Sequence, residues 1–111
     1  MDRVTDYKSI VKQILEGIAV QFPPDGDIVS ERIYDELQEH FELLRVGWRK
    51  KHRVHGIVLH VDGKDGKVWI QHDGTEDGIA DALLEAGIPK EHIVLAFHPP
   101  YKRPYTGFSP T

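Results

Sequence analysis

Apolar residues recur at three- and four-residue steps along the N-terminal part of the chain, which predicts an amphipathic helix over residues 2–21 with one buried stripe. The helix is expected to end within segment 22–27, because proline cannot continue a helix and Asp-Gly favours a turn. The residues assigned to the buried stripe are Val4, Tyr7, Ile10 or Val11, Ile14 and Ile18.

The pattern over residues 28–44 supports two interpretations. In the first, Ser30 caps a helix with one apolar stripe, and helix propensity favours this interpretation. In the second, a strand over 28–34 and a strand over 41–48 are joined by a turn at 35–38. The helical stripe would consist of Ile33, Leu37, Phe41 and Leu44.

An antiparallel hairpin is predicted next, because β-forming residues over 54–61 return at 67–71 after the Gly-Lys-Asp-Gly turn at 63–66. Pairing Val61 with Val68 sorts alternate residues onto two faces, and the pattern continues across a turn at 49–52. The face expected in the core carries Leu44, Val46, Trp48, His55, Ile57, Leu59, Val61, Val68, Ile70 and His72.

The opposite face of this sheet would mix polar and apolar side chains. It is too apolar for plain solvent exposure, so another element or a partner is expected to cover it. Its members would be Phe41, Leu43, Val54, Val58, His60, Trp69 and Gln71.

A second helix is expected to begin at 74–77, with Thr75 as its cap and two acidic residues at its positive end. Gly87 and Pro89 would end it, a short helical turn would follow at 89–92, and the apolar run 93–97 predicts a buried strand. The proline-rich tail 98–105 is expected to be extended. The inward helix positions are Ile79, Leu83 and Ala86, flanked by Ala80, Ala82 and Leu84.

The composition indicates one soluble domain over residues 1–111 with one core. The absence of cysteine excludes thiol chemistry and fits a cytoplasmic protein. No apolar run is long enough for a membrane helix, and the charged N-terminus does not resemble a secretory signal. With a net charge of -4, any contact with DNA would need a local basic patch.

Seven histidines raise the question of a metal site. On a regular strand His55 and His60 point to opposite faces, while His55 and His72 share a face without an obvious third ligand. The chain has no HExxH motif and no paired Cys/His spacing. No metal site and no cofactor are therefore expected.

Two basic segments are candidates for contacts. Residues Arg49, Lys50, Lys51 and Arg53 lie at an expected hairpin tip, which is either a solvated turn or a phosphate contact. The aromatic and basic tail could stack on bases, bind a partner as an extended segment, or pack on its own domain. Its residues with these properties are Tyr101, Lys102, Arg103, Tyr105 and Phe108.

The sequence shows no arrangement of residues typical of an active site, so an enzyme is not expected. The serines lack a nucleophile-elbow context, and the segment 63–67 lacks the spacing of a phosphate-binding loop. The acids beside or near glycine are interpreted as turn and cap residues, namely Asp62, Asp65, Asp73, Glu76 and Asp77.

The segments GW at 47–48, RVHG at 53–56, WIQ at 69–71, GTE at 74–76 and HPP at 98–100 together resemble the XisI family of fdxN-element excision controlling factors of cyanobacteria. The other matching positions are Gly87, Pro89, Lys90, Ile93, Val94, Arg103, Tyr105 and Thr106. The resemblance implies an α+β fold, and it favours the hairpin for 28–48. The expected order is an N-terminal helix, an antiparallel four-stranded meander, a second helix and a late strand.

The resemblance also implies action with an XisH-like partner in controlling a recombinase that excises a DNA element during heterocyst differentiation. It supplies no catalytic residues. We therefore expect a non-enzymatic accessory factor that binds its partner through Trp69, Tyr101, Arg103 and Tyr105, with the basic tip near DNA and no membrane contact. A second copy of the chain is another partner to test. The alternatives are a stand-alone DNA-binding module that uses the basic tip and a histidine-dependent metal enzyme.

Overall fold

The computed structural model describes residues 3–111, with side chains from residue 7 onward, so residue 2 and the side chain of Val4 lie outside the described part. It has the predicted α+β class. The elements are α1 (Arg3–Val20), β1 (Val29–Asp35), β2 (His40–Arg49), β3 (His52–Lys64), β4 (Lys67–Asp73), α2 (Ala80–Glu85), the 3-10 helix η1 (Lys90–His92), β5 (Ile93–Leu95) and the 3-10 helix η2 (Arg103–Tyr105).

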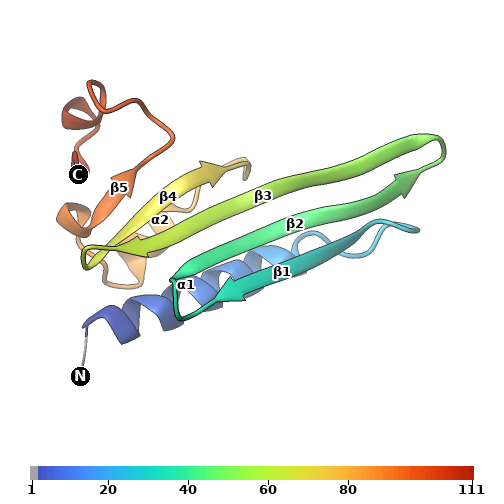
Figure 1. The fold of residues 1–111 in the computed structure, drawn as a ribbon, viewed down its shortest axis with the longest axis horizontal. Helices are drawn as coiled ribbons and strands as arrows, with labels where there is room; N and C mark the ends of the chain where they lie inside the picture. Colours follow the sequence, from blue (N-terminus) through green and yellow to red (C-terminus); the bar gives the residue numbers. More distant parts are fainter. Residues whose placement is uncertain (1–2) are drawn as a thin grey trace.

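The five strands form one sheet in the order β1-β2-β3-β4-β5 (Figure 1). The first four strands pair antiparallel as predicted, and β5 adds to β4 in parallel. Segment 28–48 is the predicted hairpin and not a helix. Its turn is stabilised by Asp35, whose carboxylate accepts the backbone N–H groups of Leu37 and Gln38 at 3.1 and 3.0 Å.

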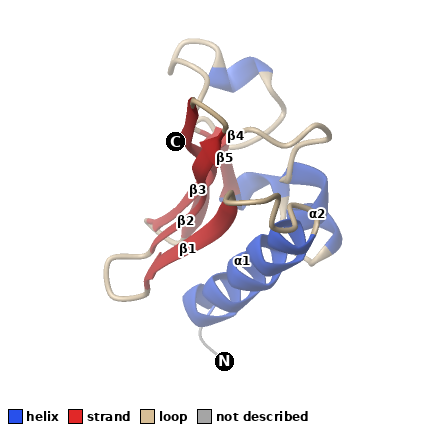
Figure 2. Ribbon diagram, turned by 90° about the vertical axis from the view of Figure 1, so that its right-hand side faces the viewer, coloured by secondary structure: helices blue, strands red, loops and turns tan. Residues whose placement is uncertain are grey.

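Both helices cover the same face of the sheet, as Figure 2 shows, and the core lies between them and the strands. The centre of the α1 stripe is Val11, Leu15 and Ala19, which recur every four residues and are buried. Val11, one of the two alternatives predicted at that step, is thus confirmed. The rest of the predicted stripe is displaced, since Tyr7, Ile10, Ile14 and Ile18 flank this line and are partly buried. The sheet contributes Phe41, Leu43, Leu59, Val61, Val68, Ile70 and Ile93, and the α2 region contributes Ile79, Leu83 and Ile88.

The predicted assignment of side chains to the two faces of the sheet is partly wrong, because β3 contains a β-bulge. Leu44 pairs with Ile57, but Leu43 pairs with Leu59, so Val58 is an extra residue and the alternation changes there. As a result Phe41 and Leu43, which were predicted on the mixed face, are buried in the core. Residues predicted in the core lie instead on the face away from the helices, namely Leu44, Val46, Trp48, His55 and Ile57.

A second bulge lies in β4. Gly63 pairs with Val68 and Val61 pairs with Ile70, two positions away from the predicted pairing of Val61 with Val68. This difference keeps Val61, Val68 and Ile70 on the core face, as predicted. Further along, His60 pairs with His72, so Gln71 is the extra residue and His72 is exposed.

The second helix begins later than predicted, because Asp73 organises the segment before it. One Asp73 carboxylate oxygen accepts the N–H of Thr75 at 3.0 Å, and the other accepts the N–H of Ile79 at 2.7 Å. Thr75 is thus not the cap, and α2 starts at Ala80. The C-terminal end agrees with the prediction, since Gly87 has a φ of 101°. The predicted inward residue Ala86 is exposed.

The C-terminal segment 96–111 is a series of turns, and the prediction of an extended tail is wrong. Backbone bonds run from the N–H of Lys102 to the oxygen of Pro99 and from the N–H of Tyr105 to the oxygen of Lys102. Pro104 lies at the start of η2, where proline is tolerated because its missing N–H has no helical partner. The strand predicted over 93–97 is shorter, and Phe97 is exposed outside it.

The loop that follows α1 packs directly on β2. A Cβ on Gly47 would lie 2.6 Å from the Asp27 oxygen and from the Ile28 Cα, so only glycine fits this contact. The Arg45 guanidinium strengthens the same contact by donating to the Phe22 oxygen at 2.8 Å. Across residues 3–111, none of the helices combines the length and the apolar character that crossing a membrane requires.

Candidate functional site

The sheet face away from the helices divides into a covered and an exposed half. At the β4–β5 end, the C-terminal segment covers it, and Val94, which pairs with Trp69, is fully buried there. Over β1, β2 and β3 nothing in the described chain covers this face. The expectation that another element covers the mixed face is confirmed at the β4–β5 end. For the exposed half, coverage by a partner stays a prediction.

Trp69, predicted to bind a partner, is largely engaged within the chain. Its ring lies 4.8 Å from the Lys64 Nζ and 5.7 Å from the Arg103 guanidinium carbon, and its Nε1 donates to the Lys64 oxygen at 3.2 Å. Arg103 also holds the C-terminal segment together. It donates to the backbone oxygens of His98 and Ala96 at 2.9 and 3.2 Å.

The other two predicted partner residues are the exposed ones. Tyr105 is 89% exposed and Tyr101 is 71% exposed, and both belong to the segment that Arg103 anchors. The structure therefore brings Trp69 and Arg103 into contact, and this contact holds the C-terminal segment on the sheet. Tyr101 and Tyr105 lie on the same segment and are exposed. Whether these residues contact a partner stays a prediction.

A patch of apolar side chains, here called the open-face patch, lies on the exposed half of the sheet. Its pairings run across three strands, from Val29 to Val46 and from Leu44 to Ile57. Ile33 and Trp48 are each 49% exposed, well beyond what a core position allows. Glu31 lies opposite Leu44 on the same face, so the patch is apolar with an acidic residue within it. Exposed apolar side chains grouped on one face in this way are typical of a docking site. The patch consists of Val29, Ile33, Leu44, Val46, Trp48 and Ile57.

The basic residues Arg49, Lys50, Lys51 and Arg53 lie at the predicted hairpin tip, between β2 and β3, and all four are exposed. Figure 1 shows this tip projecting at one end of the molecule. Arg49 pairs with Asp25 at 2.6 Å, and the Arg53 guanidinium carbon lies 5.4 Å from the Trp48 ring. The two lysines form the outermost part of the tip, next to the open-face patch.

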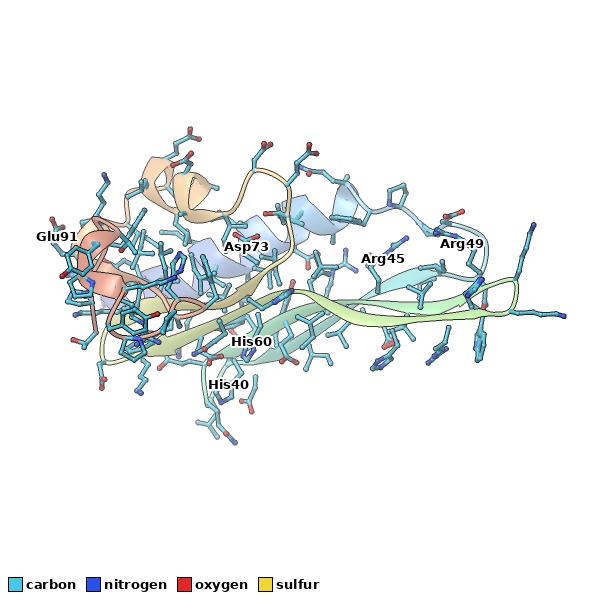
Figure 3. All side chains as sticks on the ribbon, turned by 90° about the horizontal axis from the view of Figure 1, so that it is seen from above. His40, Arg45, Arg49, His60, Asp73 and Glu91 are labelled. Carbon is cyan, nitrogen blue, oxygen red and sulfur yellow. The ribbon has the colours of Figure 1, made fainter. Side chains whose placement is uncertain are left out.

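A cluster of histidines and carboxylates lies at the opposite end of the open face. Asp62 Oδ1 is 2.7 Å from His40 Nδ1 and 2.9 Å from His60 Nε2. Figure 3 shows His40 and His60 side by side on the sheet face away from α1. The hydrogen bond to Asp62, together with the charge of Asp62, raises the pKa of His40. Asp62 is a strand residue, so its assignment to a turn is corrected.

Sequence reasoning missed this cluster, because it did not predict the register between β2 and β3. The Val58 bulge places His55 and His60 on the same face, contrary to the prediction. The signal that was present is a repeated motif of alternate residues, His40-Phe41-Glu42 and His60-Val61-Asp62, on two strands that pair. Each motif directs its two polar side chains to one face, since side chains alternate along a strand.

Comparison with known proteins identifies the family. Residues 1–110 match the family model described as XisI protein, while no curated protein sequence matches the chain significantly. The structure is similar to the crystal structure of a XisI-like protein from Anabaena variabilis ATCC 29413, with 36% identity, a TM-score of 0.92, and coverage of 96% of this chain and 97% of that one. It is also similar to the crystal structure of the fdxN element excision controlling factor XisI from Anabaena variabilis ATCC 29413, with 34% identity, a TM-score of 0.89, and coverage of 99% and 100%. From its N-terminal helix to its C-terminal turns, the chain belongs to the XisI family.

Proposed function

We propose that this protein is a non-enzymatic accessory factor that controls the site-specific excision of a DNA element, and that it acts by binding an XisH-like protein. The observation that carries the proposal is the similarity along the whole chain to a protein named as an excision controlling factor, at 34% identity and a TM-score of 0.89. The name describes control of a reaction, which is consistent with an adaptor.

The surface of the molecule supports a role in binding a protein partner. The open-face patch combines apolar side chains with Trp48, and the C-terminal segment presents two exposed tyrosines. Aromatic side chains of this kind are enriched in protein interfaces because they bury a large area at low cost in conformational entropy. We assign the open-face patch as the principal docking surface and the segment around Tyr105 as an additional contact.

Co-expression of the full chain with an XisH-like protein, followed by size-exclusion chromatography with light scattering, tests the proposal. We expect a stable complex that Ile33→Asp and Trp48→Ala weaken by at least about tenfold, since interface residues that are desolvated on binding each contribute on the order of 1–2 kcal/mol. Leu37→Asp is the matched control, because Leu37 is 92% exposed but lies in the β1–β2 turn outside the patch.

The outcomes separate the two surfaces. If Tyr105→Ala disrupts the complex and the open-face variants do not, the partner docks on the C-terminal segment. Two separate peaks at micromolar concentrations of both proteins would contradict the proposal. Direct DNA binding by the isolated protein would then be the function to examine, because Lys50 and Lys51 form an exposed basic tip.

A further inference from the structure

Two histidines and two carboxylates form a cluster on the adjacent strands β2 and β3, and the proposed function assigns no role to it. His40 and Glu42 on β2 point to the open face, as do His60 and Asp62 on β3. The antiparallel register pairs His40 with Asp62 and Glu42 with His60, so each imidazole lies opposite a carboxylate. We propose that this cluster is a binding site for a divalent transition-metal ion of the Zn²⁺ type, with His40, His60 and Asp62 as its ligands.

The distances between the three donor atoms fit such an ion. One nitrogen from each histidine and one Asp62 oxygen all lie within 4.8 Å of one another. Around tetrahedral zinc, ligand bonds of about 2.0–2.1 Å place neighbouring donor atoms about 3.3 Å apart. The observed separations of 2.7 and 2.9 Å from Asp62 Oδ1 are slightly shorter, because hydrogen bonds now join these atoms. When the ring nitrogens bind a metal instead, a small side-chain rotation opens the required space.

The neighbours of the cluster match the outer shell that metal-binding residues have. Glu42 Oε1 lies 3.6 Å from His60 Nδ1, at ion-pair distance, on the side of the ring away from the Nε2 that would bind the ion. Gln71 Nε2 donates to the second Asp62 oxygen at 3.2 Å, which leaves Oδ1 for the ion. Gln71 is the extra residue of the β4 bulge, and a bulge commonly serves to redirect a side chain.

The scaffold holds the ligands in place. Phe41 lies between His40 and Glu42, Val61 lies between His60 and Asp62, and both apolar side chains are buried in the core. Ligands on strands anchored in this way keep their relative positions better than ligands on loops. Because exposed His40 stands at the edge of the cluster, an ion can enter from solvent without any rearrangement of the core.

The donor set indicates the class of ion. Two imidazoles and one carboxylate suit Zn²⁺ and its first-row neighbours, whereas Mg²⁺ and Ca²⁺ prefer oxygen ligands. Three protein ligands leave a coordination position for water or for an acidic group of a partner. The site borders the open-face patch, since Glu42 pairs with Ile33, but the inference does not depend on the proposed partner.

Titration of the untagged, chelator-treated full chain with Zn²⁺ by calorimetry tests the site, together with the absorption spectrum of Co²⁺ bound in its place. We expect one ion per chain with micromolar or tighter affinity. His60→Ala and Asp62→Asn should each weaken binding by more than about tenfold, and Glu42→Gln by about tenfold, the loss typical of an outer-shell partner. His55→Ala is the matched control, because His55 is exposed on the same face of β3 but outside the cluster.

Two results would overturn the inference. One is the absence of saturable binding at submillimolar Zn²⁺ by the wild-type chain. The other is stoichiometric binding that His60→Ala and Asp62→Asn leave as strong as in the wild type, which would assign the ion to other surface histidines. His40→Gln shows whether a loss of affinity comes from unfolding. The His40 side chain is exposed and not part of the core, so this variant should stay folded and still lose affinity for Zn²⁺.

Discussion

The guanidinium of Arg103 lies over the indole ring of Trp69, with 5.7 Å between the guanidinium carbon and the ring centroid. Trp69 belongs to β4 and Arg103 to η2, so the contact joins the sheet to the C-terminal segment. The same guanidinium donates to two backbone oxygens within the segment, those of His98 and Ala96. One side chain thus fixes both the internal shape of the segment and its position on the sheet.

Arg103→Ala should therefore destabilise the protein by roughly 1–2 kcal/mol, since it removes two charge-assisted hydrogen bonds and one cation–π contact that are partly exposed to solvent. Urea unfolding measures the loss, and the fluorescence of Trp69 should report a more hydrated ring. Arg103→Lys is the control. It retains the charge but not the planar fork, so it should recover only part of the stability. Full recovery by lysine would show that charge alone holds the segment.

The elements of this fold follow from local patterns, but the sorting of side chains onto faces does not. Hydrophobic periodicity and turn residues are enough to predict α1 and the hairpin of β3 and β4, and the family resemblance decided the hairpin of β1 and β2. The assignment of Phe41 and Leu43 failed because Val58 is an extra residue in its strand. A bulge depends on contacts distant in sequence, here the bond from the Gly74 N–H to the Val58 oxygen at 2.7 Å.

Contacts distant in sequence also explain why the predictions of element ends and of the candidate sites were partly wrong. Thr75 has the residue type of a cap. The Asp73 carboxylate, which lies outside the helix, accepts the backbone N–H groups of Thr75 and Ile79 instead. The prolines of the tail suggested an extended segment. Arg103 instead holds the segment in turns by donating hydrogen bonds to the backbone oxygens of His98 and Ala96. The histidine cluster needs the register between β2 and β3, which no single segment specifies.

Gly47→Ala should destabilise the protein strongly, because the new methyl group would meet backbone atoms of Asp27 and Ile28 at 2.6 Å. Backbone atoms cannot move aside as a flexible side chain does, so we expect a loss of about 2–3 kcal/mol in the free energy of unfolding. Gly56→Ala on β3 is the matched control, since a Cβ there has no atom within 4 Å. It should be neutral or stabilising by up to about 1 kcal/mol. Equal losses in both variants would contradict the proposed close approach.

The contact between α1 and β1 should make stability depend on pH. Tyr34 donates to the Glu16 carboxylate at 2.5 Å and Arg32 donates to it at 2.6 Å, and the Tyr34 bond in particular lowers the pKa of Glu16. Because this pKa is lower in the folded chain than its ordinary value of about 4.3, the unfolded chain binds more protons at acid pH. The stabilisation is therefore present above about pH 5 and is lost as the pH falls through the folded pKa.

Glu16→Gln should remove this contribution and flatten the dependence of unfolding free energy on pH between about pH 5 and pH 3. The effect should stay below about 1 kcal/mol, since the Glu16 side chain is 49% exposed and solvent screens the pair. Urea unfolding at the two ends of this range measures it. Tyr34→Phe removes the largest cause of the lowered pKa and should have a similar effect on the slope. An unchanged slope in both variants would show that Glu16 has no such role.

Under the proposed function, the basic tip should contribute through phosphate contacts to the DNA affinity of the complex with the XisH-like protein. Replacing Lys50 and Lys51 with glutamine removes two exposed charges and, if both contact phosphate, should reduce the slope of log affinity against log salt by about 1.8, or about 0.9 for each contact. Fluorescence anisotropy with labelled duplex at several salt concentrations measures this slope. Lys102→Gln is the control, because Lys102 is exposed in the C-terminal segment, away from the tip. The same loss measured with the isolated protein would favour a stand-alone DNA-binding module, and an unchanged slope in the complex would remove the tip from the DNA interface.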